Sequence, residues 1–588
     1  MQGRIKNIGG VYRRHSITDT CGILFCLYPA LLEQLLRGRD TTMVELQGGK
    51  ISNSKKTIGW KKIIVNQAKE FCLSTGLHGY KYIAQAHRSV PERITWAVGV
   101  IVSLCCAVAL MQIAWEYNTS HPTITVIEST HHGIWNYRFP AVTICDINRV
   151  SLNRTRDLVR SLKLPNNNVS REDLVMEMRL LNEMLDPGVF GRNVTINLTN
   201  LQDIFDFNQL SIPNVMRLVT RNCSEIIARC KWKGYIKPCA SMFETSLSRD
   251  GLCCSFNYFG IVDSEVTGAP EVKSASKSHS KISHEPRRVT ACGYQTGLTV
   301  LIKNAPEDYH AAILGGFGVK VMLHDPYDYP DRNVENKLMG VGTEVFYSVN
   351  PEVTYSTDDV RSLPVSKRNC IFFDERPNFG GSIRRYSYHN CLAVCRSSTI
   401  FEKCGCVPYY HQNLRTLNNI QNDSKNVSDN RRVKRICNLR DVDCAYRYRH
   451  WFETSWPGIN VTSEHLPPRI TSESAGRPCK CIPDCDLLRY PLESSAGIFD
   501  RNNSYHDLAF YEGVQLKNLS VLHVFFTDLV STQYRRDIYY NWHNLFASFG
   551  GLLGLFAGFS LMSGFELIYF FSIRLIADIF SDRKKRRM

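Results

Sequence analysis

Two long apolar segments dominate the pattern of hydrophobic and polar positions along the chain. Residues 94–115 are 22 positions without a charge, preceded by Glu92 and Arg93. Residues 545–573 are 29 positions with a single charge, Glu566. A helix needs about 20 apolar residues to cross the hydrocarbon core of a bilayer. The pattern therefore predicts a transmembrane helix at 94–115 and a second one within 541–573, which is long enough to tilt or bend.

The segment between the two spans, residues 116–540, has the mixed pattern of an α+β domain. Stretches rich in β-branched and large apolar residues predict strands, whereas residues 150–250, and 171–185 in particular, look more helical. Residues 391–485 combine many cysteines with helix and loop, and residues 269–288 predict an exposed loop. His131–His132 is interpreted as a solvated loop pair. The predicted strands are 123–128, 298–302, 319–323 and 521–526.

The net charge of +16 is concentrated at the two ends of the chain. Residues 1–93 contain 15 Lys/Arg and 6 Asp/Glu, and residues 574–588 contain 6 Lys/Arg and 2 Asp/Glu. The ends thus carry +13 of the +16, and the middle of the chain is close to neutral. Positive charge beside membrane spans marks the cytosolic side. We therefore expect a cytosolic region at 1–93 and a short cytosolic tail at 574–588, and no binding of nucleic acid.

An apolar stretch at Cys21–Leu32 follows Arg13 and Arg14, so a signal peptide is an alternative interpretation of the N-terminal region. It would place residues 33–93 outside the cell. Those residues are rich in Lys and contain no N-x-[ST] sequon. A short cytosolic helix or membrane-surface segment is the preferred interpretation.

All eleven sequons of the chain lie between the two predicted spans. One sequon is weak evidence, but confinement of eleven to one segment indicates that this segment is lumenal or extracellular. The predicted glycosylation sites are Asn118, Asn153, Asn168, Asn193, Asn197, Asn222, Asn422, Asn426, Asn460, Asn502 and Asn518.

The cysteines follow the same division, because 17 of the 22 lie between the spans. Such density is typical of disulfides in an oxidising compartment, and an odd number leaves at least one thiol unpaired or paired between chains. The pairs Cys404/Cys406 and Cys479/Cys481 would also suit zinc, but disulfides are favoured in an extracellular domain. The chain has no serine-hydrolase, metalloprotease or P-loop motif, so neither an enzyme nor a cofactor is expected.

The second span contains residues that a simple anchor does not need. Gly550, Gly554 and Gly558 share one helical face, which suits close helix packing. Glycine weakens a helix, so Gly558-Phe559-Ser560 could unwind, and freed carbonyls could replace the hydration shell of an ion. Glu566 within a span is a functional hypothesis by default, although a position near the cytosolic interface would let it reach water. Neither span has a ladder of Arg, so voltage sensing is not expected.

From residue 71 onward, an ordered set of motifs resembles the degenerin/epithelial sodium channel family, and within it the insect pickpocket branch. The set begins with His78-Gly79, Phe139-Pro-Ala-Val-Thr-Ile-Cys145 and Gly251-Leu-Cys-Cys-Ser-Phe-Asn257. It continues with Cys391-x3-Cys395, Cys404-Gly-Cys406, Cys479-x-Cys481-x3-Cys485 and the run from Gly550 to Ser560.

The resemblance implies a trimeric, sodium-selective, voltage-independent channel of the plasma membrane that amiloride blocks. It also implies a hand-like extracellular domain with a β palm and helical finger and thumb regions, the thumb at about 370–490. By resemblance, Gly558-Phe559-Ser560 is the selectivity motif, and Glu566 is a pore carboxylate. Relatives often have a small residue where this chain has Phe559, and a second acid where it has Tyr569.

Three further residues acquire a gating role from the resemblance alone. His78 and Gly79 match the gating motif before the first span, and Ala547 matches a position at which side-chain size controls closure. The disulfides implied in the same way are Cys370–Cys485, Cys391–Cys481, Cys395–Cys479, Cys404–Cys444, Cys406–Cys437 and Cys145–Cys253. The resemblance does not pair Cys223, Cys230, Cys239, Cys254 and Cys292.

Several alternatives remain open on the sequence. Arg432-Val433-Lys434-Arg435 matches a furin-type R-x-[KR]-R site, but a solvated basic patch is the plainer interpretation. A non-conducting receptor or adhesion subunit and an ATP-gated cation channel would share the two-span architecture. The stimulus, and the choice between homomers and heteromers with related subunits, are not encoded in recognisable motifs.

Overall fold

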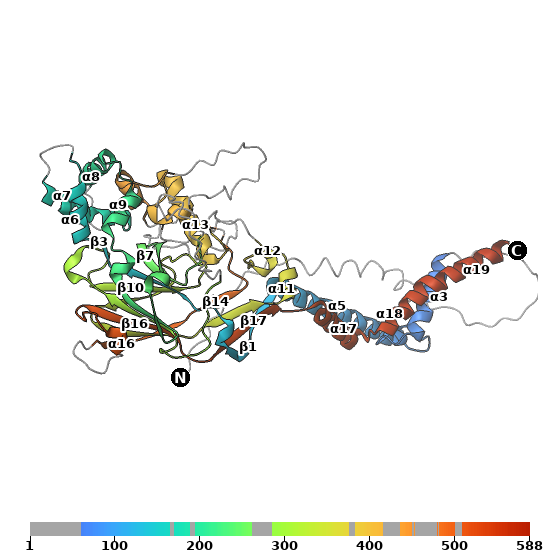
Figure 1. Ribbon diagram of the computed structural model, residues 1–588. Helices are drawn as coiled ribbons and strands as arrows, with labels where there is room; N and C mark the ends of the chain where they lie inside the picture. The colour runs from blue at the N-terminus through green and yellow to red at the C-terminus, as the bar shows by residue number, and fades with distance from the viewer. Residues whose placement is uncertain are drawn as a thin grey trace, which may run out of the picture. The chain divides into compact units, whose positions relative to one another are not determined.

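The computed structural model describes residues 60–164, 170–188, 195–261, 285–375, 383–414, 435–449, 452, 479, 481–499 and 508–587. The chain divides into two compact units. The central unit covers residues 123–537, and the terminal unit joins the chain up to residue 122 with the chain from residue 538 onward (Figure 1).

The central unit is built on β-sheets of six, five, four and two strands. The six-stranded sheet runs β15-β12-β16-β8-β4-β5, the five-stranded sheet β11-β10-β2-β7-β6, and the four-stranded sheet β1-β17-β13-β14, while β3 pairs with β9. The bounds are β1 Thr123–Gly133, β2 Ala141–Asp146, β3 Asn148–Ser151, β4 Ile227–Trp232, β5 Tyr235–Lys237, β6 Phe243–Ser248, β7 Gly251–Phe256, β8 Leu298–Lys303, β9 Tyr309–Ala312, β10 Gly318–His324, β11 Glu335–Gly340, β12 Thr343–Val349, β13 Glu352–Ser356, β14 Leu487–Arg489, β15 Leu492–Ile498, β16 Leu519–Phe526 and β17 Val530–Ile538.

Strands from opposite ends of the central unit meet in these sheets. β16 pairs with β12 in parallel and with β8 in antiparallel orientation. Alternate side chains of the six- and five-stranded sheets share one apolar core, with Ile144 and Phe256 from one sheet and Val300 and Leu522 from the other. This alternation is expected of strands that bury one face.

The helices of the central unit pack around a second apolar core. α6, α7, α8 and α9 cluster together (Figure 1), and Leu158, Leu201 and Val215 share their core with Tyr409 and Val442 from the cysteine-rich region. The bounds are α6 Leu152–Ser161, α7 Arg171–Glu177, α8 Thr195–Phe207, α9 Ile212–Val219, α10 Cys223–Ile226, α11 Asp358–Ser362, α12 Val365–Arg368, α13 Tyr388–Cys404, α14 Val442–Arg447 and α16 Leu508–Tyr511, with a 3₁₀ segment at Met178–Met184.

The four predicted strands are present, as β1, β8, β10 and β16. Two other predictions were wrong. The helical region ends at Ile226, because residues 227–256 form β4 to β7. β4 and β7 pair with the distant strands β8 and β2, and β5 and β6 pair with β4 and β7. His131 and His132 belong to β1 and not to a loop. Of the predicted loop at 269–288, residues 269–284 lie outside the described part of the chain.

Eight disulfides tie the central unit together. Six of them join the cysteines that the resemblance implies, and the cysteines suggested as zinc ligands are all used in these bridges. The other two are Cys223–Cys254 and Cys230–Cys239. In the described part of the central unit, Cys292 is a free thiol.

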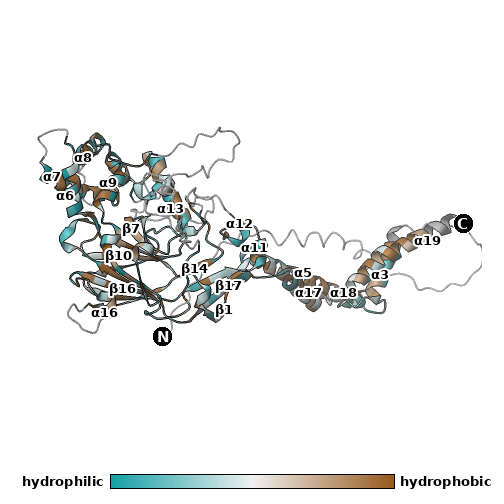
Figure 2. Cartoon of the chain, in the orientation of Figure 1, coloured by the Kyte–Doolittle hydropathy of each residue, from teal (hydrophilic) through white to brown (hydrophobic). Residues whose placement is uncertain are grey.

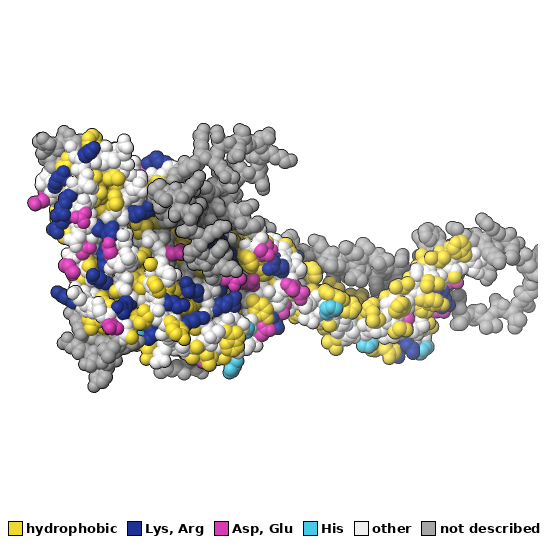
Figure 3. All heavy atoms as spheres, in the orientation of Figure 1, with side chains coloured by type: hydrophobic (Ala, Val, Ile, Leu, Met, Phe, Trp, Pro, Cys, Tyr) yellow, Lys and Arg dark blue, Asp and Glu magenta, His cyan; other side chains and the backbone are white. Residues whose placement is uncertain are grey.

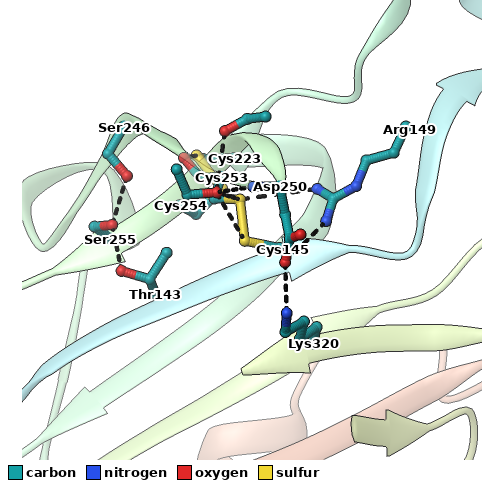
Figure 4. The surroundings of a disulfide bond; sticks show 12 residues. Thr143, Cys145, Arg149, Cys223, Ser246, Asp250, Cys253, Cys254, Ser255 and Lys320 are labelled. Carbon is teal, nitrogen blue, oxygen red and sulfur yellow. Dashed lines mark hydrogen bonds and ion pairs between the residues drawn. A yellow bond between two sulfur atoms is a disulfide. The ribbon is translucent and has the colours of Figure 1, made fainter. Parts of the chain in front are cut away.

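Two of these bridges diverge from neighbouring residues of β7 (Figure 4). Cys253 bonds to Cys145 of β2, and Cys254 bonds to Cys223 of α10. Successive side chains of a strand point to opposite faces. β7 is therefore fixed on one face to its own sheet and on the other to a helix.

A buried charge cluster lies beside the Cys145–Cys253 bridge (Figure 4). Asp250 lies 2.7 Å from the Lys320 amine and 3.8 Å from the Arg149 guanidinium. Burial alone would raise the pKa of Asp250, but the two nearby positive charges outweigh burial and lower that pKa. The cluster thus holds a compensated charge in the interior, where losing one partner would be costly.

The terminal unit consists of helices with largely apolar surfaces. Among the described residues, α5 (Val90–Ser120) is long and apolar enough to cross a membrane. The pair Trp542–Ala557 and Leu561–Ser581, bent by 73°, is apolar enough to be one broken span or a re-entrant loop. The bounds are α3 Trp60–Ser74, α4 Tyr80–Ala84, α5 Val90–Ser120, α17 Trp542–Ala557, α18 Leu561–Ile568, a π-helical segment Tyr569–Arg574 and α19 Leu575–Arg587.

Apolar side chains cover the outside of this unit. Figure 2 shows hydrophobic residues along α5, α17 and α18, and the face of the unit drawn in Figure 3 is mainly hydrophobic. Large side chains such as Ile113 and Leu555 are 62% and 75% exposed. So much exposed apolar surface fits a lipid environment or further subunits. α5 extends beyond the predicted 94–115, because Ser89 and Pro91 start the helix earlier and polar residues continue it to Ser120.

Candidate functional site

The second apolar helix breaks at the three residues Gly558, Phe559 and Ser560. α17 ends at Ala557, and Gly558 adopts a left-handed conformation with φ of 67°. Its backbone N–H donates to the Gly554 carbonyl at 2.9 Å, which is a usual way to end a helix at glycine. Ser560 then starts α18, and its hydroxyl oxygen accepts a hydrogen bond from the Ser563 N–H at 3.2 Å. The break lies at the residues where the sequence suggested unwinding.

The segment before α5 contacts this break directly. The His78 N–H donates to the Ala557 carbonyl at 3.0 Å and so satisfies one of the carbonyls left free at the end of α17. A Cβ atom placed on Gly558 would lie 2.7 Å from Cδ2 of the His78 ring. The structure thus brings His78 and Gly558, 480 positions apart in the sequence, into van der Waals contact.

Gly79 has a separate steric reason to be glycine. Its φ is 85°, and an added Cβ would lie 2.6 Å from Cγ2 of Val100 in α5. A side chain there would be strained in its backbone and would collide with α5. The His-Gly pair therefore connects both apolar helices: His78 contacts the second and Gly79 the first.

Glu566 faces the chain's own N-terminal segment. Its carboxylate accepts a hydrogen bond from the Thr75 hydroxyl at 3.0 Å. Two turns further on, the Arg574 guanidinium lies 2.6 Å from the Glu70 carboxylate. Tyr569, which stands where relatives often have an acid, is 48% exposed. Neither Thr75 nor Glu70 was recognised from the sequence. The available signal was the spacing of Glu566, Phe570 and Arg574, which are four residues apart and so lie on one side of the helix.

The face of α17 that carries the glycines is not covered by any residue in the described part of the chain. Ala547 is exposed, and Cβ atoms added to Gly550 or Gly551 would meet no atom within 4 Å. At Gly554 an added Cβ would find only the Phe559 carbonyl, at 3.8 Å. α17 instead contacts α5 elsewhere, for example where the Ser103 hydroxyl donates to the Phe556 carbonyl at 2.5 Å. The glycine positions therefore leave room for another helix.

Five predicted glycosylation sites fall in the described part of the chain. Asn153, Asn197 and Asn222 are exposed, and Asn118 and Asn518 are half-buried. Asn118 belongs to the last turn of α5. The other six lie outside the described residues, namely Asn168, Asn193, Asn422, Asn426, Asn460 and Asn502.

Of the predicted protease site, Arg432 and Lys434 lie outside the described residues, and Arg435 is described. The two guanidinium nitrogens of Arg435 contact the two carboxylate oxygens of Asp441 at 2.7 and 2.8 Å. Its carbonyl accepts a hydrogen bond from the Val407 N–H at 2.8 Å. The residue that would enter a protease is thus held by both its side chain and its backbone.

Two carboxyl groups of the central unit have pKa values above the ordinary range of an aspartate. Burial raises the pKa of Asp484 to about 7, against the hydrogen bond that its carboxylate accepts from the Tyr388 N–H at 3.0 Å. Burial, with the neighbouring charge of Asp325, raises the pKa of Asp328 to about 6. Both groups therefore favour the protonated form in the folded protein more than an exposed Asp does.

Comparison with known proteins identifies the type of chain. The family model described as "Amiloride-sensitive sodium channel" matches residues 71–570. "Sodium channel protein Nach" of Drosophila melanogaster is 26% identical over 515 residues, covering 86% of this chain and 87% of that protein. "Pickpocket protein 28" of the same species is 24% identical, covering 91% and 83%. "Bile acid-sensitive ion channel" of Mus musculus is 22% identical, covering 86% and 87%. The predicted resemblance, including its insect pickpocket branch, is confirmed.

Proposed function

The chain belongs to the amiloride-sensitive sodium channel family, whose members are ion channels and not enzymes, and we propose that it is a subunit of a sodium-selective, voltage-independent cation channel. Membership implies a plasma-membrane protein with a disulfide-rich extracellular domain. We propose further that α5 and the broken helix α17–α18 are its two spans, that both termini are cytosolic, and that amiloride blocks the channel. A sensory or epithelial role suits such a channel.

The observation that carries the proposal is the break at Gly558–Ser560. A helix interrupted at membrane depth leaves backbone carbonyls without partners unless protein, water or ions supply them. His78 supplies one partner at Ala557, which fixes the break in place. The hydroxyl of Ser560 is already engaged at the start of α18. The Ser560 carbonyl likewise accepts a hydrogen bond from the Gly564 N–H at 3.1 Å. The carbonyls of Gly558 and Phe559 are therefore the better candidates for contact with a sodium ion.

Two spans cannot enclose a pore, so the proposal requires several subunits. The open face of α17, with Ala547, Gly550 and Gly551, supports close packing of copies around an axis. By family resemblance we propose a trimer, either of this chain alone or with related subunits. Three copies would place a ring of carbonyls around the permeant ion.

Substitution at Ser560 tests the location of the filter. Ser560→Ala removes the N-cap of α18, a change worth about 1 kcal/mol, and should shift the backbone of the break. We expect Ser560→Ala and Ser560→Cys to change the sodium-to-potassium permeability ratio, measured as the reversal potential under bi-ionic conditions. Glu566→Gln should leave this ratio less affected, because it changes the charge of the side chain and hardly changes its shape. An unchanged reversal potential in the Ser560 variants, with a shift in Glu566→Gln, would place the filter elsewhere.

The second candidate is a non-conducting receptor or adhesion subunit of the same architecture. Current recorded from the chain expressed alone and with related subunits separates the two. Absence of current in every combination, with the protein present at the surface, would favour the second candidate. The family match excludes the ATP-gated cation channels considered from the sequence.

A further inference from the structure

Three side chains of the second span form a stripe that contacts the N-terminal helix α3 and the turn after it. Glu566, Phe570 and Arg574 are spaced by four residues, and residues at this spacing lie on one side of a helix. Glu566 contacts Thr75, and Arg574 contacts Glu70. Between these polar pairs, Phe570 packs edge-on against Phe71, with ring centroids 5.8 Å apart. The two segments run antiparallel, because Glu566 meets the later N-terminal residue and Arg574 the earlier one.

The hydroxyl of Thr75 has a defined direction. Its oxygen accepts a hydrogen bond from the Leu77 N–H at 3.3 Å, and its single proton is donated to Glu566. Thr75 is buried, and its own N–H donates to the Phe71 carbonyl at 2.8 Å. The hydroxyl is therefore positioned by the backbone of the turn that leads, three residues later, to His78. A hydrogen bond to a charged group is stronger than one between neutral groups.

We propose that Thr75 is a positioning residue for Glu566, and that this pair fastens the His78-Gly79 segment to the inner part of the second span. The inference rests on the proposed channel function. It assigns Glu566 a different main role from that of a charge exposed to permeant ions: the carboxylate is an acceptor that holds the N-terminal segment under the break. The Phe71–Phe570 contact and the Glu70–Arg574 ion pair continue the same attachment toward α19.

The two roles of Glu566 predict different responses to substitution. A pore charge acts through its charge, so Glu566→Gln and Glu566→Ala would both lower the unitary conductance and Thr75 would not matter. An acceptor acts through its oxygen, which the amide of Gln retains and Ala lacks. The attachment therefore predicts that Glu566→Gln lowers the open probability only slightly, whereas Glu566→Ala lowers it strongly. Thr75→Val should also lower it strongly, because valine has nearly the shape of threonine but no hydroxyl.

Recording at matched surface density provides the functional test. We expect Thr75→Val and Glu566→Ala each to lower the open probability about tenfold, as expected for loss of a hydrogen bond to a charged group, with little change in unitary conductance. Thr75→Ser should restore wild-type behaviour, and the double variant should be no worse than either single one. The proposal would be overturned if Thr75→Val left the open probability unchanged, or if Glu566→Gln lowered it as much as Glu566→Ala does.

Chemical cross-linking tests the contact without requiring any current. The free thiol of Cys72 lies in the same apolar cluster as Phe570, so it is first replaced by serine. Thr75→Cys and Glu566→Cys are then combined in this full chain with a protease site inserted after residue 425, and membranes are treated with a short bis-maleimide and then with the protease. On a reducing gel we expect a full-length band from the double variant and two fragments from each single variant. Two fragments from the double variant would overturn the contact. If the cross-link forms in a chain that never conducts current, the Thr75–Glu566 contact stands and the proposed channel function is refuted.

Discussion

Gly558 meets two separate steric requirements at one backbone position. Its φ of 67° costs a residue with a Cβ roughly 1–2 kcal/mol. A Cβ would also lie 2.7 Å from the His78 ring, so the ring or the helix end would have to shift. Both requirements exclude a side chain at this position.

We therefore predict that Gly558→Ala abolishes most of the sodium current per channel at the surface. Gly99→Ala in α5 is the matched control, because a methyl group there meets no atom within 4 Å and alanine favours a helix. Whole-cell current divided by surface-biotinylated protein measures the effect. Equal values for the two variants would show that the His78 contact and the left-handed turn are dispensable.

Ala547 gives a prediction about the neighbouring subunits. Within one chain its side chain is exposed, so a larger residue has room and the fold of the chain should tolerate it. Around a symmetry axis the same position would be crowded in the closed state. We expect Ala547→Val and Ala547→Phe to give constitutive, cell-damaging sodium current. Unchanged resting conductance in a channel that conducts would contradict this.

Asp484 gives a prediction about pH. Its pKa of about 7 in the folded protein lies above the ordinary value of about 3.9, so the native state binds the proton more tightly than the unfolded chain. The contribution of Asp484 to the stability of the folded state is therefore fully present below about pH 4 and is lost as the pH rises toward 7. We expect Asp484→Asn to match the wild type in melting temperature near pH 4.5 and to exceed it near pH 8. A pH-independent difference in the full-length protein would refute the assignment.

At the scale of elements, the segment around Arg435 makes the furin-type motif a poor substrate. A protease requires the arginine side chain and an extended backbone, but Arg435 is paired with Asp441 and its carbonyl is bonded to Val407. The next residue but one, Cys437, is bonded to Cys406. We predict a single uncut band on a reducing gel of surface protein, even with added furin. Two fragments in the wild type that disappear in Arg432→Ala would show that cleavage occurs.

The sequence predicted elements well wherever a local pattern governs them. β8, β10 and β16 are runs of apolar and β-branched residues, and the break at Gly558 follows from the intrinsic weakness of glycine in a helix. β4 to β7 were missed because they are short and lack a run of apolar or β-branched residues; the Phe243–Ser248 strand, for example, has three polar residues in succession. β4 and β7 pair with β8 and β2, which no local window contains, and β5 and β6 pair with β4 and β7 as hairpins.

At the scale of the whole molecule, the features that the sequence could not predict are contacts between residues far apart in the chain. The family resemblance implied six bridges, which the structure also forms, but it was silent on Cys223–Cys254 and Cys230–Cys239. The Thr75–Glu566 bond joins residues 491 positions apart. A single sequence carries no sign of such a pair, because neither residue has an unusual neighbourhood of its own.

The order of strands in the six-stranded sheet governs how the protein can be made. β16 lies between β8 and β12, yet it is synthesised after the whole cysteine-rich region and only 15 residues before α17 begins. At about 5–20 residues per second, even the 115 residues between Cys370 and Cys485 take roughly 6–23 s to translate. Throughout that time β8 and β12 lack their shared partner, and such unpaired edges invite aggregation. A ribosome that stops just before residue 519 would therefore release an extracellular domain with an open core, and we expect the chaperones of the secretory pathway to hold the nascent chain until α17 is nearly complete.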